Sequence, residues 1–137
     1  MEIDLAEGQT VSAFVLDLDT ATARVNVGAE AEVNALFSAT DPVALLRIPG
    51  EAPKGLRLLA PESVEKLGYP DPERGRDGST QWFVQSAAEG AKYCVLVSTR
   101  RVGEETLVAT TVTYSAADGG DIVGVAKQRV NAALDAG

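Results

Sequence analysis

Residues 31–38 have the sequence Ala31-Glu32-Val33-Asn34-Ala35-Leu36-Phe37-Ser38. Every second position is apolar, and the intervening positions are polar except at Leu36. Because successive side chains of an extended chain point to opposite sides, this period of two predicts a half-buried β-strand. Residues 106–114 repeat the pattern with valines and threonines, which favour the pleated conformation.

Six further segments resemble strands in the same way: residues 11–18, 22–27, 43–48, 56–60, 81–87 and 92–99. Gly28, Gly90 and Gly103 each stand between two strand-like segments, where a glycine readily takes the positive φ of a tight turn. These glycines predict hairpins over residues 22–37, 81–99 and 92–114. Short strands at this spacing predict a mainly β fold, an antiparallel β-sandwich of about eight strands in a single domain over residues 1–137.

Two segments depart from the alternation. Residues 62–80 contain Gly68, Pro70, Pro72, Gly75 and Gly78 and predict a long ordered loop, which a short helical turn at 61–67 precedes. Residues 120–137 predict one α-helix with Asp121 as its N-cap and Gly137 as its C-cap. Its apolar stripe consists of Ile122, Ala126, Val130, Ala133 and Leu134. Either the sheet covers this stripe, or the helix begins a linker to a further domain.

The charge balance argues against several classes of partner. The chain has 20 acidic and 12 basic residues and a net charge of −8. Arg100 and Arg101 are its one adjacent basic pair, whereas phosphate backbones and anionic lipids are held by clusters of lysine and arginine. We therefore expect no nucleic-acid partner and no membrane partner. The sequence leaves the cellular compartment open, because the single cysteine, Cys94, gives no disulfide pattern.

Catalytic chemistry is restricted by the absence of histidine. Serine and cysteine nucleophiles usually need an imidazole as their base, and most zinc sites need imidazole as a ligand. Carboxylate chemistry remains open, but the pairs Asp17/Asp19, Glu30/Glu32 and Glu104/Glu105 are expected to be solvated surface charges. We expect no cofactor, and Cys94 is expected to be a small buried side chain.

Residues 71–79 carry a weak likeness to a calcium loop. A calcium loop closes on a bidentate acid, and here that offset holds Trp82. Arg74 and Arg76 would also repel the ion. We therefore expect an arginine–carboxylate turn and no metal site.

Four residues are candidates for a ligand contact or an interface: Tyr69, Asp77, Trp82 and Gln85. An aromatic ring such as that of Trp82 can stack on the C–H face of a sugar, and Gln85 could hydrogen-bond its hydroxyls. The alternative is that Trp82 anchors the core or a domain contact, and Tyr69 has the same two interpretations. Asp77 belongs to the same loop segment, residues 69–79.

Three stretches occur in a distinctive order. They are ALFSATDPVALLRI at 35–48, LGYP at 67–70 followed by QWFVQ at 81–85 and YCVLV at 93–97, and AKQRVNAALDAG at 126–137. In this order they resemble the N-terminal β-sandwich domain of bacterial glycoside hydrolases whose catalytic domain is a helical (α/α) toroid, the fucosidase-like and related group. In that family the C-terminal helix of the sandwich begins the linker to the toroid.

The resemblance implies a non-catalytic accessory domain. In such enzymes the toroid carries the general acid and base, so no catalytic residue is expected in this chain. The sandwich packs against the toroid and edges its active site, which implies an exposed apolar patch near the helix stripe or Trp82. Two alternatives stay open. One is an independent carbohydrate-binding module with Trp82 on a solvent-facing strand, and the other is a small carboxylate-dependent enzyme.

Overall fold

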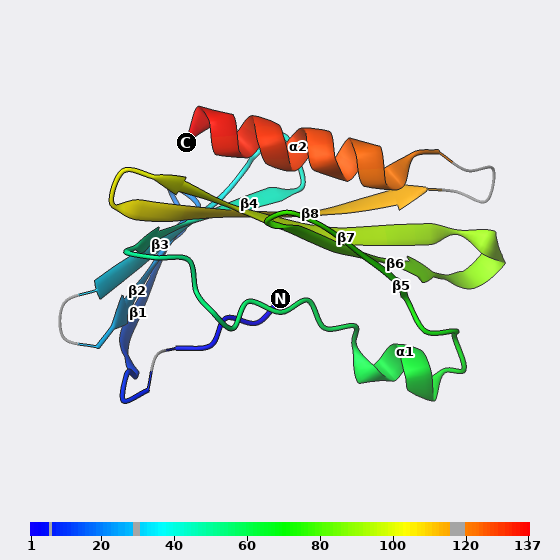
Figure 1. Ribbon diagram of the computed structural model, residues 1–137, viewed down its shortest axis with the longest axis horizontal. Coiled ribbons are helices and arrows are strands. Elements are labelled where there is room, and N and C mark those ends of the chain that lie inside the picture. The colour runs from blue at the N-terminus through cyan, green and yellow to red at the C-terminus, as the bar shows by residue number, and fades with distance from the viewer. Residues whose placement is uncertain (6, 29–30, 116–119) are drawn as a thin grey trace.

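The computed structural model describes residues 1–5, 7–28, 31–115 and 120–137 (Figure 1). Its strands are β1 (Val11–Asp17), β2 (Thr22–Val27), β3 (Ala31–Phe37), β4 (Val43–Pro49), β5 (Glu73–Asp77), β6 (Thr80–Ser86), β7 (Lys92–Val102) and β8 (Glu105–Ser115). The helical elements are α1 (Glu62–Lys66), the 3-10 turn η1 (Ala88–Gly90) and α2 (Ile122–Ala136). The expected class, mainly β with antiparallel strands and a C-terminal helix, is confirmed.

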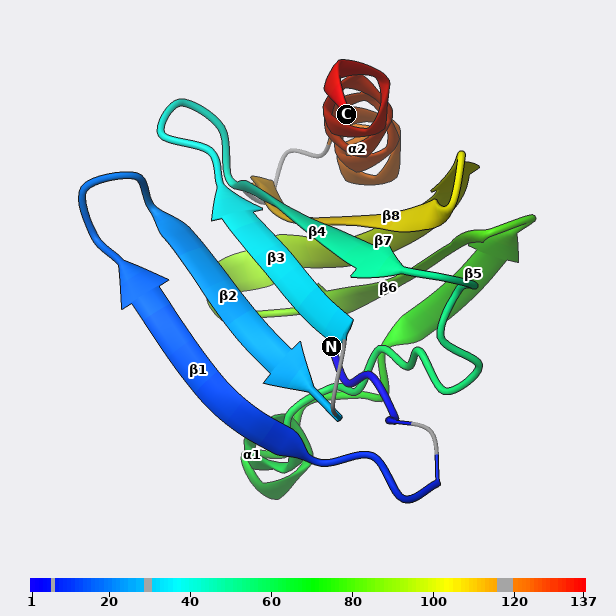
Figure 2. The same cartoon turned by 90° about the vertical axis from the view of Figure 1, so that its left-hand side faces the viewer.

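The strands form one sheet in the order β1-β2-β3-β4-β8-β7-β6-β5, instead of the two stacked sheets of a sandwich. Two four-stranded meanders meet at the antiparallel pair β4–β8. Strands β3 and β4 share four paired positions, whereas β7 and β8 share eleven. This short pairing lets β1–β3 turn away from the plane of β6–β8, as Figure 2 shows. We call the β1–β3 part the wing.

Glycine turns close the expected hairpins. Gly28, Gly90 and Gly103 all have positive φ, and they lie between β2 and β3, β6 and β7, and β7 and β8. In each case the flanking strands pair antiparallel. Alternating apolar and polar residues before and after a glycine were therefore sufficient to predict these hairpins.

Helix α2 lies across one face of the sheet, over β4, β7 and β8 (Figure 1). The core beneath it consists of Cys94, Leu96, Leu107, Ala109, Ile122, Ala126, Val130 and Leu134. The sheet thus covers the apolar stripe, with Ala133 partly buried at its margin. The hydroxyl of Thr113 donates to the carbonyl of Ile122 at 2.8 Å, so a side chain of the buried strand also holds the first turn of the helix.

Asp121 caps α2 as expected, with its Oδ1 accepting from the backbone N–H of Gly124 at 2.7 Å. Gly124 leaves room for this carboxylate, because a Cβ there would lie 2.1 Å from Oδ2 of Asp121. Replacing Asp121 with alanine should lower the free energy of unfolding by about 1 kcal/mol, since one N–H of the first turn loses its acceptor. Urea denaturation followed by far-ultraviolet circular dichroism measures this. An unchanged midpoint would contradict the capping role, and Asp121→Asn, which retains an acceptor, is the control.

The opposite face of the sheet is partly covered by the long connection from β4 to β5. Its residues Leu56, Leu58 and Ala60 pack on Phe83, Val97 and Val108 to form a second core. Residues 56–60 were expected to be a strand, and this expectation is wrong. Their burial does alternate, but the segment lies over the sheet and pairs only once, between Arg57 and Glu2. A period of two indicates extended backbone and does not reveal whether a strand partner exists.

The prediction of a loop over residues 62–80 is wrong for the second half of that segment. The short helix α1 forms near the expected turn, but Glu73–Asp77 is strand β5, which pairs with β6 at the edge of the sheet. Four of its five side chains are charged, so no apolar alternation marks it. Pairing with β6 through the turn at Gly78, whose φ is +56°, determines this strand.

Candidate functional site

Trp82 lies on the face of the sheet that α2 covers, and it is enclosed on two sides. A Cβ on the cross-strand neighbour Gly75 would come within 2.3 Å of the indole ring. The ammonium of Lys127, from α2, lies 4.6 Å from the ring centroid in cation–π geometry. The same Nζ lies 3.2 Å from Oδ2 of Asp77. The structure therefore brings Trp82 and Asp77 together through Lys127, and the indole packs against the helix-side core.

Gln85 lies on the opposite face from Trp82, because the two residues are three positions apart in one strand. It is buried beside the long connection, where its Nε2 donates to the carbonyl of Pro70 at 2.9 Å and to that of Ser86 at 3.2 Å. Its Oε1 has no hydrogen-bond partner among the described residues. A single sugar on one face of the sheet could not contact both Trp82 and Gln85.

Tyr69 follows α1 in the connection, and its N–H donates to the carbonyl of Val64 at 3.2 Å. It is partly buried and precedes Pro70, the acceptor of Gln85. The four sequence candidates therefore form two separate groups. Asp77 and Trp82 both contact Lys127 of α2, whereas Gln85 is hydrogen-bonded to the connection that contains Tyr69.

The described carboxylates show the features of structural surface charges. Asp17 accepts hydrogen bonds across its own turn, chiefly from the Thr20 hydroxyl and then from the N–H groups of Asp19 and Thr20, which lower the pKa of this carboxyl. A general acid needs a raised pKa instead. Glu105 forms an ion pair with Arg47 at 3.6 Å, and Glu30 falls outside the described residues. Within the described residues, no three acidic or cysteine side chains gather as a metal site would require.

No helix among residues 1–5, 7–28, 31–115 and 120–137 is long and apolar enough to cross a bilayer. The longest, α2, has 15 residues, whereas a spanning helix needs about 20.

Cys94 is fully buried under α2, and burial raises the pKa of its thiol to about 11. Only the thiolate reacts with alkylating reagents, so at pH 8 the folded protein should react with iodoacetamide at least ~100-fold more slowly than the urea-unfolded chain. Mass spectrometry of timed aliquots measures both rates. Fast labelling of the folded protein, with circular dichroism unchanged, would contradict the buried placement.

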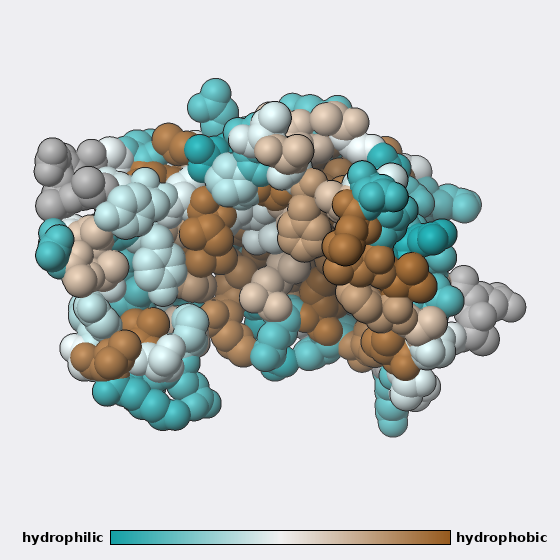
Figure 3. Space-filling view, turned by 180° about the vertical axis from the view of Figure 1, so that it is seen from behind, coloured by the Kyte–Doolittle hydropathy of each residue, from teal (hydrophilic) through white to brown (hydrophobic). Residues whose placement is uncertain are grey.

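The largest concentration of exposed apolar side chains lies on β1, one of the two edge strands. Its exposed residues are Val11 (54%), Phe14 (62%), Val15 (49%) and Leu16 (51%). Figure 3 views the molecule from the β1 side and shows hydrophobic residues gathered there. The register places Phe14 and Leu16 on the face of Val25 and Ala23, and Val15 on the other face. The expectation of an exposed apolar patch at the helix stripe or Trp82 is wrong, because the sheet covers that stripe and Trp82 packs against the same core. The exposed apolar residues lie on the wing instead.

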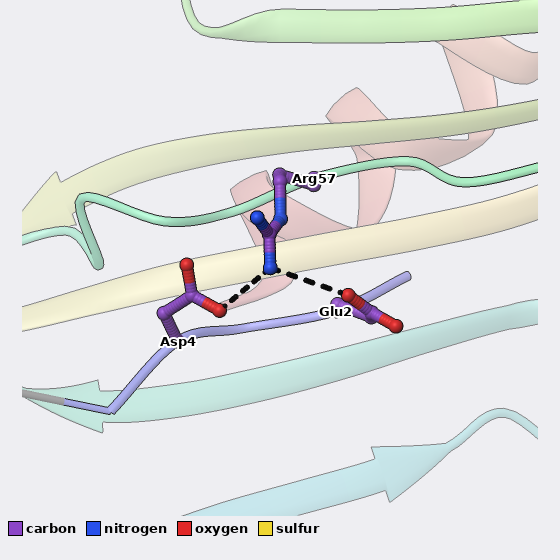
Figure 4. A network of polar contacts seen from close by, with 3 residues as sticks. All are labelled: Glu2, Asp4 and Arg57. Atoms are coloured by element: carbon purple, nitrogen blue, oxygen red, sulfur yellow. Dashed lines mark hydrogen bonds and ion pairs between the residues drawn. The ribbon is translucent and has the colours of Figure 1, made fainter.

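A groove of about 710 Å³ adjoins this strand on the face away from α2. Its apolar lining includes Leu5, Val11, Val25, Val33, Ile48 and Pro53. The N-terminal segment crosses the mouth and is held by Arg57, whose Nη2 lies 2.9 Å from Oδ1 of Asp4 and 3.3 Å from Oε2 of Glu2 (Figure 4). Gly55 makes room for this contact, since a Cβ there would clash with the Asp4 carboxylate. The wing is thus apolar on the concave face as well as at its edge.

The charge of the chain is concentrated in the same part of the sequence. Residues 1–46 contain eight acidic residues and a single basic one, Arg24, a net charge of −7 out of the total of −8. The wing therefore has an apolar edge strand and lies within the most acidic part of the sequence. Sequence reasoning missed this surface, although two signals were present: apolar residues at consecutive positions of 14–16, and the unequal distribution of charge.

No family model, curated protein or solved structure matches this chain.

Proposed function

We propose that this chain is a non-catalytic accessory β-domain that packs against a neighbouring domain through the β1 side of its wing. The observation that carries the proposal is the row of four half-exposed apolar side chains on β1. A free-standing domain seldom leaves such a row contiguous and uncovered. Fully burying a side chain of this size contributes about 1.5–3 kcal/mol. Covering the exposed halves of all four would contribute about 3–6 kcal/mol before the cost of association.

The partner we propose is the helical (α/α) toroid of a glycoside hydrolase, on the strength of the sequence resemblance. Trp82 and Asp77 are already engaged by Lys127, and Gln85 is buried. Asp77 is exposed but forms an ion pair with Lys127, and Tyr69 is partly buried. We therefore assign the main contact to β1 and give residues 69–79 a peripheral role.

Isothermal titration of the chain with the purified toroid of a fucosidase-like hydrolase, expressed without its own β-domain, tests this proposal. We expect association that Phe14→Ser weakens at least ~10-fold, because the most exposed aromatic side chain of the patch is removed. Leu67→Ser is the matched control, since Leu67 is exposed at the end of α1, outside the wing. Absence of association, or equal loss in both variants, would contradict the proposal.

Two measurements test the alternative functions: titration with mono- and oligosaccharides monitored by tryptophan fluorescence, and an assay for glycan hydrolysis. In the titration we expect a flat response, because Gly75 and Lys127 occupy the surroundings of the single indole. A saturable shift that Trp82→Ala abolishes without loss of fold would favour a carbohydrate-binding module. Hydrolysis of a glycan by the pure protein would favour a carboxylate-dependent enzyme.

A further inference from the structure

The two edges of the sheet differ sharply in chemistry. Strand β5 has the sequence Glu-Arg-Gly-Arg-Asp, so one edge of the sheet carries charged side chains at four of five positions. Strand β1 has the sequence Val-Ser-Ala-Phe-Val-Leu-Asp and carries a charge only at its last residue. Edge strands present unpaired backbone N–H and C=O groups, and proteins usually protect them with charge, proline or a covering segment. One edge of this sheet is protected in that way and the other is not.

We propose that β1 binds an extended segment of a partner protein by strand addition, and that this segment is apolar at alternate positions and basic between them. The proposal deepens the proposed function and rests on it, because it specifies how the wing holds its neighbour. In strand addition the backbone hydrogen bonds supply affinity, and alternate side chains supply specificity.

The side chains of β1 provide contacts on both faces of an added strand. Phe14 and Leu16 project on the concave face, beside the apolar groove, and Ala13 and Val15 project on the other. A bulge between Val11 and Ala13 interrupts the regular register at the start of the strand. The segment available for regular pairing is therefore the stretch from Ala13 to Asp17.

Charge selects a basic partner over a second copy of this chain. Two wings brought edge to edge would each contribute the net −3 of residues 11–37, from four acidic residues and one arginine. Like charges opposed across an interface are unfavourable, whereas lysine or arginine on the incoming strand would be attracted to Asp17 and its neighbour Asp19. A screened attraction of this kind also predicts weaker binding as salt is raised.

The test uses ¹⁵N-labelled protein and the acetylated peptide KVTVKVTVK as the probe. We expect chemical-shift changes in β1 and β2 and slower hydrogen exchange of the β1 amides. We also expect weaker binding at 500 mM than at 50 mM sodium chloride, because salt above about 100 mM screens charges more than about 10 Å apart. The charge-reversed peptide EVTVEVTVE should bind at least ~10-fold more weakly.

A matched pair of variants locates the site. Val15→Lys places a cation on β1 and should weaken peptide binding at least ~10-fold. Val102→Lys makes the same change at an equally exposed valine near the end of β7, 51% against 49%, and should leave binding unchanged. Dispersed spectra for both variants show that the fold is retained.

Several outcomes would overturn the proposal: equal binding of the two peptides, no binding, or a footprint outside β1. Self-association of the wild-type protein that Val15→Lys abolishes would also overturn it, in favour of a second copy as the occupant. The titration with the toroid tests the proposed function independently of the peptide experiment. Toroid binding with a footprint away from β1 would reject strand addition and leave the accessory role standing, whereas peptide binding at β1 without toroid binding would reject the toroid as partner.

Discussion

Replacing Leu107 with alanine should lower the free energy of unfolding by about 3 kcal/mol, within the range of about 2–5 kcal/mol typical of buried leucines. Leu107 is only 1% exposed and lies on β8 in the core beneath α2. The substitution removes apolar contacts and leaves a cavity between two rigid elements, a strand paired on both sides and a 15-residue helix. Urea denaturation followed by tryptophan fluorescence and by circular dichroism measures the change.

Leu18→Ala is the control for this prediction. Leu18 is 82% exposed in the turn after β1, so the same deletion of side-chain atoms should change the stability by less than about 0.5 kcal/mol. Equal effects of the two substitutions would show that α2 does not cover β8 as described. Coincident fluorescence and circular-dichroism transitions would show that helix and sheet unfold as one unit.

Gly75→Ala should lower the free energy of unfolding by about 1–3 kcal/mol and change the emission of the single tryptophan. A Cβ at position 75 would lie 2.3 Å from Cε2 and Cζ2 of Trp82 and 2.7 Å from its Nε1. Trp82 cannot move away freely, because Lys127 and the helix-side core hold it. Overpacking against a confined ring is destabilising, and the displaced indole enters a more polar environment.

Gly120→Ala provides the comparison, because its φ is not positive and the nearest atom to a new Cβ there is 3.9 Å away. It should leave stability and emission nearly unchanged. Trp82→Leu should relieve the clash, so that adding Gly75→Ala to Trp82→Leu costs less than adding it to the wild type. Additive effects in this double-mutant cycle would contradict direct contact between residues 75 and 82.

Together these contacts explain why Trp82 is a poor candidate for an open sugar platform. The glycine that makes room for the indole comes from the neighbouring hairpin strand β5, and the lysine that lies over the ring comes from α2, which is distant in sequence. The surface left open is instead at β1, where the apolar residues of the strand meet the acidic N-terminal third of the chain. The exposed wing is the observation behind the proposed accessory role, and the proposal that its neighbour is a toroid rests on the sequence resemblance alone.

Seven of the eight strand segments expected from alternation are strands in the structure, and Asp121 and Gly137 cap α2 as expected. These features depend on neighbours within a few residues: the period of two, a carboxylate within reach of the first helical turn, a glycine at the end. The apolar stripe of α2 likewise predicted which of its residues are buried. The absence of histidine excluded imidazole chemistry before any coordinates were known.

Tertiary structure decided what local patterns do not encode. Residues 73–77 form strand β5 because they pair with β6, although their sequence does not alternate. Residues 56–60 alternate in burial, yet they lie over the sheet and form a single bridge, between Arg57 and Glu2. Which strands become edges depends on the order in which two meanders meet, and this order determines that β1 is open while Trp82 is enclosed. Short-range periodicity determines which way a side chain points. Whether anything covers that side chain depends on segments far away in the chain, so the candidate surface emerged only from the folded sheet.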